Sequence, residues 1–172
     1  MTSDRSQEIL DKIRAHVGKE VVIQSPDEFS RASFRKYALA IGDFNPLYRD
    51  REFAKKYGLR DVMAPPTLIC DTWQYFDSLV DERGDIADRH QVRVVPNGLR
   101  AGNDYEFFQA IHPDDIITAK WKIKDVWEKS GRSGRLVFQM VELAFYNQRN
   151  ELLTINREVM AYSPDQPKNT AK

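Results

Sequence analysis

The stretch that decides the fold is Gly-Asp-Phe-Asn-Pro-Leu-Tyr-Arg-Asp, residues 42–50. It follows residues 30–41, where apolar side chains recur at helical spacing and predict a helix with one apolar face. Ser30 is a typical N-cap residue and Gly42 a typical C-terminal stop. The Asn-Pro pair then predicts a turn. The apolar residues of the predicted face are Phe34, Tyr37, Ala38 and Ile41.

Shorter helical segments and one short strand surround this stretch. The segment at 68–80 follows paired prolines in Ala-Pro-Pro-Thr, residues 64–67, and is apolar enough to predict a buried central helix. The other expected elements are a helix at 6–17 ended by Gly18, a strand at 21–23, one or two helical turns at 51–57 closed by Gly58, and a polar loop at 81–90.

The C-terminal half changes to the alternating pattern of half-buried antiparallel strands. We predict strands at 103–110, 116–127, 136–146 and 152–162, with a flexible glycine-containing loop at 130–134. The chain is therefore predicted to be α+β, with a helix packed on a curved antiparallel sheet. We expect one domain over residues 1–163, including the short N-terminal helix, and a disordered polar tail at 164–172.

Composition excludes several classes of protein. Lys+Arg and Asp+Glu are both 26 in 172 residues, which argues against a general nucleic-acid binder. The one cysteine, Cys70, allows neither an internal disulfide nor a zinc site of paired cysteines. We find no signal peptide, no apolar run of membrane-spanning length and no acidic cluster at metal-ligand spacing. We therefore expect a cytoplasmic protein that needs no metal and no cofactor.

Several blocks, in order, resemble the MaoC-like hydratase/dehydratase superfamily, and most closely its N-terminal, fatty-acid-synthase-type dehydratase branch. Besides residues 42–50 and 64–67, the matching blocks are Ala-Gly-Asn-Asp-Tyr-Glu-Phe at 101–107, His-Pro-Asp-Asp at 112–115, Gly-Arg-Ser-Gly-Arg-Leu-Val-Phe at 131–138 and Tyr-Asn-Gln at 146–148. The resemblance covers roughly residues 25–162. It implies a hot-dog fold, in which a curved antiparallel sheet wraps around a central helix.

The resemblance also implies a chemistry. In this family an aspartate and, five residues on, a histidine activate a water that adds to C3 of a 2-enoyl thioester while C2 takes a proton. Imidazole suits this role because its pKa lies near neutrality. Asp43 matches the aspartate, and Asn45 matches an asparagine that helps to fix the water. Tyr48 stands at the histidine position, and a phenol with a pKa of about 10 is a poor base. From the residues alone, an Asx-type turn or cap is the favoured interpretation of Asp43.

The departure at Tyr48 leads to a specific expectation. Some members of the family work as two unequal hot-dogs, of which only one carries the Asp–His dyad. This chain resembles the other kind, a subunit that helps to bind the acyl-CoA or acyl-carrier-protein thioester and needs a MaoC-like partner with the histidine. Two alternatives stay open: a non-catalytic acyl-CoA-binding or scaffolding hot-dog, and a self-sufficient homodimer in which Asp43 and Tyr48 act by a changed mechanism. In each case we expect at least a dimer.

Further site residues are implied by the matched blocks. Ala64, Pro66 and Thr67 are expected at the substrate-binding site, and the central helix could shape a tunnel for fatty, aromatic or steroid-derived acyl chains. Arg132 and Arg135 could meet CoA phosphates, although a solvated hairpin loop explains them equally well. The remaining polar candidates fit structural roles better: His112 as a turn histidine and Cys70 as a core residue.

Overall fold

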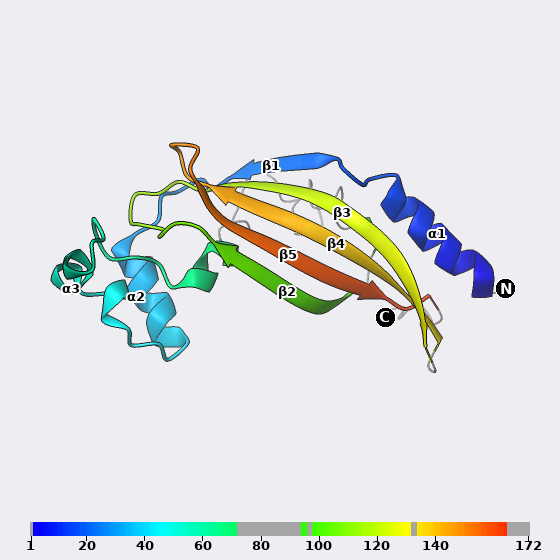
Figure 1. Ribbon diagram of the computed structural model, residues 1–172, viewed down its shortest axis with the longest axis horizontal. Helices are drawn as coiled ribbons and strands as arrows, with labels where there is room; N and C mark the ends of the chain where they lie inside the picture. Colours follow the sequence, from blue (N-terminus) through cyan, green and yellow to red (C-terminus); the bar gives the residue numbers. More distant parts are fainter. Residues whose placement is uncertain (1, 72–93, 96–97, 132–133, 165–172) are drawn as a thin grey trace, which may run out of the picture.

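The computed structural model describes residues 2–71, 94–95, 98–131 and 134–164. Its main feature is a five-stranded sheet with the order β1-β3-β4-β5-β2, in which every neighbouring pair is antiparallel. The strands are β1 Glu20–Gln24, β2 Leu99–Phe107, β3 Thr118–Gly131, β4 Gly134–Tyr146 and β5 Leu152–Tyr162. The predicted α+β class is therefore confirmed (Figure 1).

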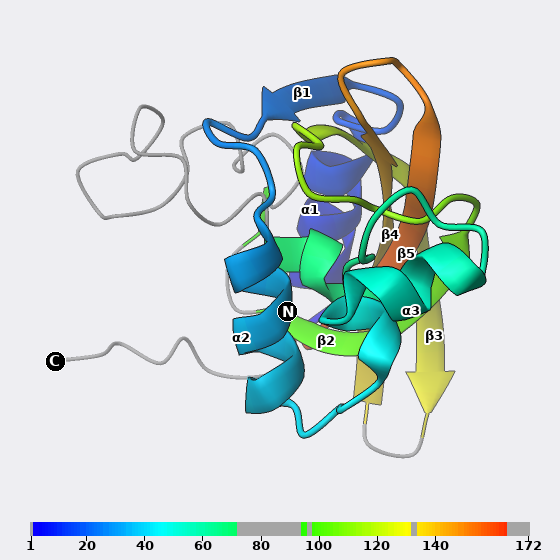
Figure 2. The ribbon, with the colours of Figure 1, turned by 90° about the vertical axis from the view of Figure 1, so that its left-hand side faces the viewer.

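The helices occupy the two ends of the sheet (Figure 1). Helix α1 lies at one end, whereas α2, α3 and the short helices between and after them gather at the other, as Figure 2 shows from that side. The helices are α1 Thr2–Arg14, α2 Arg31–Ala40, η1 Pro46–Tyr48, α3 Arg51–Lys56 and η2 Pro66–Asp71, where η marks a 3-10 helix. None of the described helices is long and apolar enough to cross a membrane.

Helix α2 is capped at both ends as its sequence predicts. The Ser30 hydroxyl accepts a hydrogen bond from the backbone N–H of Ser33, whose side chain accepts in return from the Ser30 backbone. At the other end Gly42 adopts φ +72° and donates to the carbonyl of Leu39, while Asp43 N–H donates to the carbonyl of Ala38. These paired bonds form a Schellman motif, which fixes where the chain leaves the helix.

The core lies between the sheet and the helices. Phe34 of α2, Ile13 of α1, Ile69 of η2 and Phe145 of β4 are all fully buried. The prediction that Ile41 belongs to the apolar face of α2 is wrong, because its side chain is 53% exposed. Ile41 is the C-cap residue, where the backbone turns out of the helix, so its side chain no longer follows the helical spacing.

The alternation of β3 ends at a bulge. Ala119, Trp121 and Ile123 are buried as predicted, but the register with β4 shifts between Ile123 and Asp125. Beyond this extra residue Val126 is only half-buried, because a bulge moves the following side chains out of phase.

Several predicted boundaries differ from the structure. Helix α1 covers 2–14 rather than 6–17, and β2 covers 99–107 rather than 103–110. Gly131 pairs with Gly134 and Ser130 with Arg135, so the predicted loop at 130–134 shrinks to the two residues between the strands. Strand pairing extended β3 and β4 over residues whose glycines and serines had indicated a loop, since tertiary pairing overrides local propensity.

Some predictions lie partly outside the described residues. The predicted central helix at 68–80 begins in η2, whose first residue is Pro66, but residues 72–80 and the expected loop at 81–90 fall outside. The same holds for the expected tail from residue 165 onward, whereas Pro164 is described and buried. The single-domain boundary at 163 stays a prediction.

Candidate functional site

The turn after α2 is built on two side chains that bond the backbone ahead of them. Asp43 Oδ1 accepts from the N–H of Asn45 at 3.0 Å, and Asn45 Oδ1 accepts from the N–H of Leu47 at 3.0 Å. The second contact makes Asn45 the N-cap of η1. The Asx-turn interpretation of Asp43 is therefore confirmed, and it holds the carboxylate in a fixed position beside η1.

Tyr48 ends η1 and is only 6% exposed. Burial raises the pKa of its phenol above 10, and the nearby Asp43 carboxylate raises it further through its charge and through a hydrogen bond, while a hydrogen bond from Asn45 opposes the change. Because a neutral phenol gives up its proton even less readily here than in water, Tyr48 cannot serve as a base near neutral pH.

The Ala-Pro-Pro-Thr block lies against this turn. Met63 N–H donates to the carbonyl of Leu47 at 3.0 Å, and the Thr67 and Tyr37 hydroxyls lie 2.9 Å apart, which links η2 to α2. Ala64 is buried and donates from its N–H to Ile111 O at 2.8 Å. The structure thus brings the residues predicted from the two blocks to one end of the sheet: Asp43, Asn45, Tyr48, Ala64, Pro66 and Thr67.

The two arginines predicted near the glycine loop are not brought to this place. Arg135 is the second residue of β4, at the hairpin end of the sheet that lies opposite α2 and α3 (Figure 1). Its Nη1 lies 3.8 Å from the Glu128 carboxylate across the hairpin. Arg132 falls outside the described residues. Within one chain, Arg135 is therefore separated from Asp43 by the length of the sheet.

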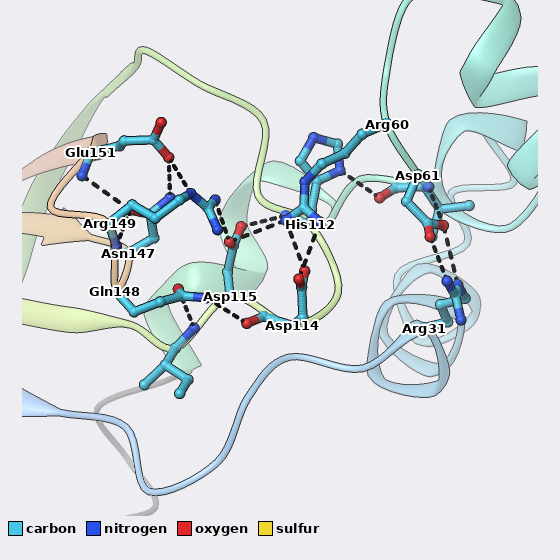
Figure 3. Close-up of polar contacts among 12 residues, drawn as sticks. Arg31, Arg60, Asp61, His112, Asp114, Asp115, Asn147, Gln148, Arg149 and Glu151 are labelled. Atoms are coloured by element: carbon cyan, nitrogen blue, oxygen red, sulfur yellow. Dashed lines mark hydrogen bonds and ion pairs between the residues drawn. The ribbon is translucent and has the colours of Figure 1, made fainter.

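A group of arginines that the sequence-based prediction missed surrounds the turn instead. Asp61 accepts two hydrogen bonds from Arg31, from Nε at 3.1 Å and from Nη2 (Figure 3). Arg51 Nε also lies 3.4 Å from the Asp61 carboxylate. The Asp61 carboxylate is only 9% exposed. Its hydrogen bonds with Arg31 lower its pKa to about 2. A cavity of about 300 Å³ opens beside this cluster, and its lining consists of Arg31, Arg35, Tyr48, Arg49, Arg51 and Val62.

A second polar cluster lies next to the first, around the buried carboxylate of Asp115 (Figure 3). Arg149 Nη2 donates to it at 2.9 Å, Arg60 Nη2 at 3.3 Å and the backbone N–H of His112 at 2.8 Å. Arg60 also pairs with Asp114 at 2.8 Å. This cluster fixes the turn before β3 to the β4–β5 turn, so its contacts explain the matched His-Pro-Asp-Asp block structurally.

His112 lines a cavity of about 530 Å³ beside this cluster. Its Nδ1 lies 3.0 Å from the carbonyl oxygen of Val62, and because a carbonyl can only accept, Nδ1 carries the proton. This contact fixes the orientation of the ring, which agrees with the predicted role of His112 as a turn histidine. Across the described ranges, no group of three or more His, Cys, Asp or Glu residues could hold a metal ion.

Cys70 follows the two blocks on η2 and is partly buried. Its thiol donates to the Tyr105 hydroxyl at 3.1 Å, and burial, followed by this contact, raises the pKa of Tyr105. The contact links η2 to β2.

Comparison with known proteins agrees with this geometry. The family model described as "FAS1-like, dehydratase domain region" matches residues 15–155. The chain is 45% identical over 116 residues to a UPF0336 protein of Streptomyces coelicolor, which covers 67% of this chain and 73% of the relative. A UPF0336 protein of Thermobifida fusca is 27% identical over 149 residues, covering 85% of this chain and 81% of the relative.

Solved structures show the same fold. The ChsH1–ChsH2 complex from Mycobacterium tuberculosis contains a chain with a TM-score of 0.73 and 17% identity, covering 98% of this chain and 96% of that one. A chain of the truncated HadBC (3R-hydroxyacyl-ACP dehydratase) complex from the same organism gives 0.63 and 18%, covering 83% and 96%. The (R)-hydratase from A. caviae gives 0.61 and 17%, covering 84% and 94%. The predicted hot-dog fold is therefore confirmed.

Proposed function

This chain is a member of the FAS1-like dehydratase domain family, and from that premise we propose that it is the subunit without the catalytic histidine in an enoyl-thioester hydratase/3-hydroxyacyl-thioester dehydratase. The observation that carries the proposal is the buried Tyr48, whose pKa is raised above 10 at the position where the dyad needs a base. The rest of the turn, Asp43 and Asn45, keeps its hydrogen-bonded shape.

The reaction explains why Tyr48 matters. In hydration, water loses a proton to a base as its oxygen bonds C3, the C2=C3 double bond opens, and C2 takes a proton. The base must be unprotonated at working pH and regain its proton each cycle. Tyr48 is protonated and held so by burial and by Asp43. The base therefore comes from another chain, and this one contributes binding.

The binding role rests on the block beside the turn. Ala64, Pro66 and Thr67 follow Met63, whose N–H donates to the carbonyl of Leu47 just after the Asp43 turn. The Thr67–Tyr37 contact links these residues to α2. We assign them to the wall that holds the acyl thioester, CoA-bound or carrier-bound. Asp43 and Asn45 keep the turn rigid beside that wall.

The partner has a place to dock on β2. This strand ends the sheet order, and its outer edge has no strand partner among the described residues. Leu99 and Phe107 at its two ends are exposed apolar side chains. An open strand edge with exposed apolar side chains at its ends favours pairing with another chain. The ChsH1–ChsH2 and HadBC complexes each contain a chain with this fold and are complexes of two named proteins, which supports a second hot-dog as the partner.

The test is activity on mixing. The purified chain is assayed with a 2-enoyl-CoA alone and after addition of a MaoC-like subunit that carries both aspartate and histidine, for instance the product of a neighbouring gene. We expect negligible hydration by this chain alone and turnover by the mixture. Replacing the partner's histidine should abolish that turnover. A mixture no more active than the partner alone would instead favour the scaffolding alternative.

A further inference from the structure

The cavity beside Tyr48 carries a strong local positive charge in a chain whose net charge is zero. Arg31, Arg35, Arg49 and Arg51 line it, and among the described residues Asp61 is the carboxylate that forms ion pairs with this group. Counting four guanidiniums against Asp61 and the Asp43 carboxylate beside Tyr48 leaves an excess of two positive charges. We call this cavity, with its lining of four arginines, Tyr48 and Val62, the arginine pocket.

Asp61 positions two of the arginines and leaves many of their donors unused. A guanidinium has five N–H donors. Arg31 donates from Nε and from Nη2 to the Asp61 carboxylate. Arg51 Nε lies 3.4 Å from the same carboxylate. The carboxylate itself is tied to the backbone by the N–H of Val62 at 2.8 Å. Both guanidiniums are thus held on a fixed anchor, with their remaining N–H groups available at the pocket.

The other two arginines have no carboxylate of their own. Within the part of the chain that the structure describes, Arg35 makes no ion pair, and Arg49 lies over the ring of Phe44 with its guanidinium carbon 5.7 Å from the ring centre. Arg35 lies one turn after Arg31 on α2, so both side chains leave the same helix face. Guanidiniums gathered without counter-charges indicate a site for an anionic ligand.

The neighbouring cavity provides the contrast. It also contains two arginines, Arg60 and Arg149, but three carboxylates neutralise them: Asp114, Asp115 and Glu151. The arginines of this cavity form ion pairs that hold turns together. Charge alone therefore singles out the arginine pocket as the anion site of the two.

We propose that the arginine pocket binds the phosphate groups of the CoA nucleotide in the acyl-CoA thioester, an inference that rests on the proposed function. The 3′-phosphate and the diphosphate of CoA together carry about −3.5 to −4 charges, which complements a pocket that has four guanidiniums and a net positive charge. A carrier protein's prosthetic arm has a single phosphodiester and would leave part of this positive charge unmatched. The volume of about 300 Å³ suits a group of phosphates rather than a whole coenzyme.

The test is binding of adenosine 3′,5′-bisphosphate to the full-length chain by isothermal titration calorimetry at low ionic strength. We expect Arg35→Ala and Arg49→Ala each to weaken binding about tenfold, the loss of one charge-assisted contact, and the double variant to abolish it. Lys36→Ala is the matched control, because it removes an exposed cation next to Arg35 that does not line the pocket. It should change the affinity by less than about twofold.

Two further measurements complete the test. One distinguishes CoA from a carrier-protein arm as the source of the phosphate, and the other distinguishes the arginine pocket from Arg135. 4′-Phosphopantetheine, which CoA and carrier proteins share, should bind much more weakly than the bisphosphate, and Arg135→Ala should leave bisphosphate binding unchanged. Equal binding of both probes, no saturable binding, or an effect of Arg135→Ala without one of Arg35→Ala would overturn the assignment. Binding is measured without turnover, so failure here removes only this pocket's role, whereas failure of the mixing assay removes the hydratase proposal.

Discussion

Residue 48 is the position at which this chain departs from the Asp–His dyad of the motif that it resembles. A histidine there could alternate between base and acid near neutral pH, whereas Tyr48 is buried and stays protonated. The substitution was evident from the sequence, because Asp43 and Asn45 match the family motif whereas Tyr48 stands at the histidine position. The sequence could not show that Asp43 and burial would act together on the phenol, since both depend on the tertiary turn.

Removing the Tyr48 hydroxyl should therefore have little effect on catalysis. In the two-chain complex we expect Tyr48→Phe to lower kcat/KM by less than about threefold, which corresponds to about 0.6 kcal/mol of transition-state stabilisation. The comparison is steady-state hydration of a 2-enoyl-CoA. A loss of a hundredfold or more would make Tyr48 a catalytic group and would support the self-sufficient homodimer.

Asp61 should stabilise the folded chain in a way that depends on pH. Its pKa is lowered from an ordinary 3.8 to about 2, so its contribution is complete above about pH 4 and is lost as the pH falls toward 2. At pH 7 we expect Asp61→Asn to cost about 1–2 kcal/mol, a modest value because both arginines are half-exposed.

Urea unfolding at several pH values measures this contribution. The gap between wild type and Asp61→Asn should narrow steadily between pH 4 and pH 2. The control is Asp27→Asn, an exposed aspartate that forms no ion pair within the described residues. A gap that stays constant over this range would show that the Asp61 charge is not what stabilises the turn.

Local sequence determines some helices and strands more completely than others. Residues 152–162 form β5 as predicted, and the caps of α2 stand where Ser30 and Gly42 place them. The ends of α1 and β2 and the β3–β4 hairpin depend on pairing with distant strands, which no local pattern reveals. The arginine pocket was missed for the same reason: its residues come from α2, the turn after η1 and α3, and each alone resembles an ordinary exposed cation.

The Schellman motif at Gly42 should be sensitive to a side chain. Gly42 has φ +72°, and an added Cβ would meet no other atom, so the cost is conformational strain rather than a clash. We expect Gly42→Ala to lower the free energy of unfolding by about 1 kcal/mol. Because Asp43 directly follows, activity of the complex should fall as well.

The matched control for Gly42→Ala is Gly131→Ala, where the added Cβ also meets nothing and φ is not positive. Chemical denaturation should show a clear loss for the first variant and a change within about 0.5 kcal/mol for the second. Equal effects at both positions would mean that the left-handed turn contributes nothing specific.

For the whole molecule, the sequence could identify the fold family and led us to expect a second hot-dog, but it could not indicate which surface would meet that partner. Among the described strands, the structure places β1 and β2 at the two edges of the sheet. The edge at β2 is longer and carries the exposed Leu99 and Phe107. Edge identity depends on strand order, which the spacing of apolar residues does not encode.

A charge on the β2 edge should therefore weaken assembly. We expect Phe107→Lys to raise the dissociation constant of the two-chain complex at least tenfold, because Phe107 is a 48% exposed apolar side chain at the proposed contact. Val22→Lys is the control, since Val22 is 54% exposed on the opposite edge strand. Sedimentation equilibrium measures both, and the reverse ranking would move the interface to β1.

Whether this chain and a dyad-bearing partner form one enzyme can be measured by the rate of 2-enoyl-CoA hydration at constant total protein while the mole ratio of the two chains is varied. We expect no rate for this chain alone and a maximum at the equimolar mixture. A rate that is greatest with this chain alone, or that simply follows the amount of partner, would show that the two chains do not form one enzyme.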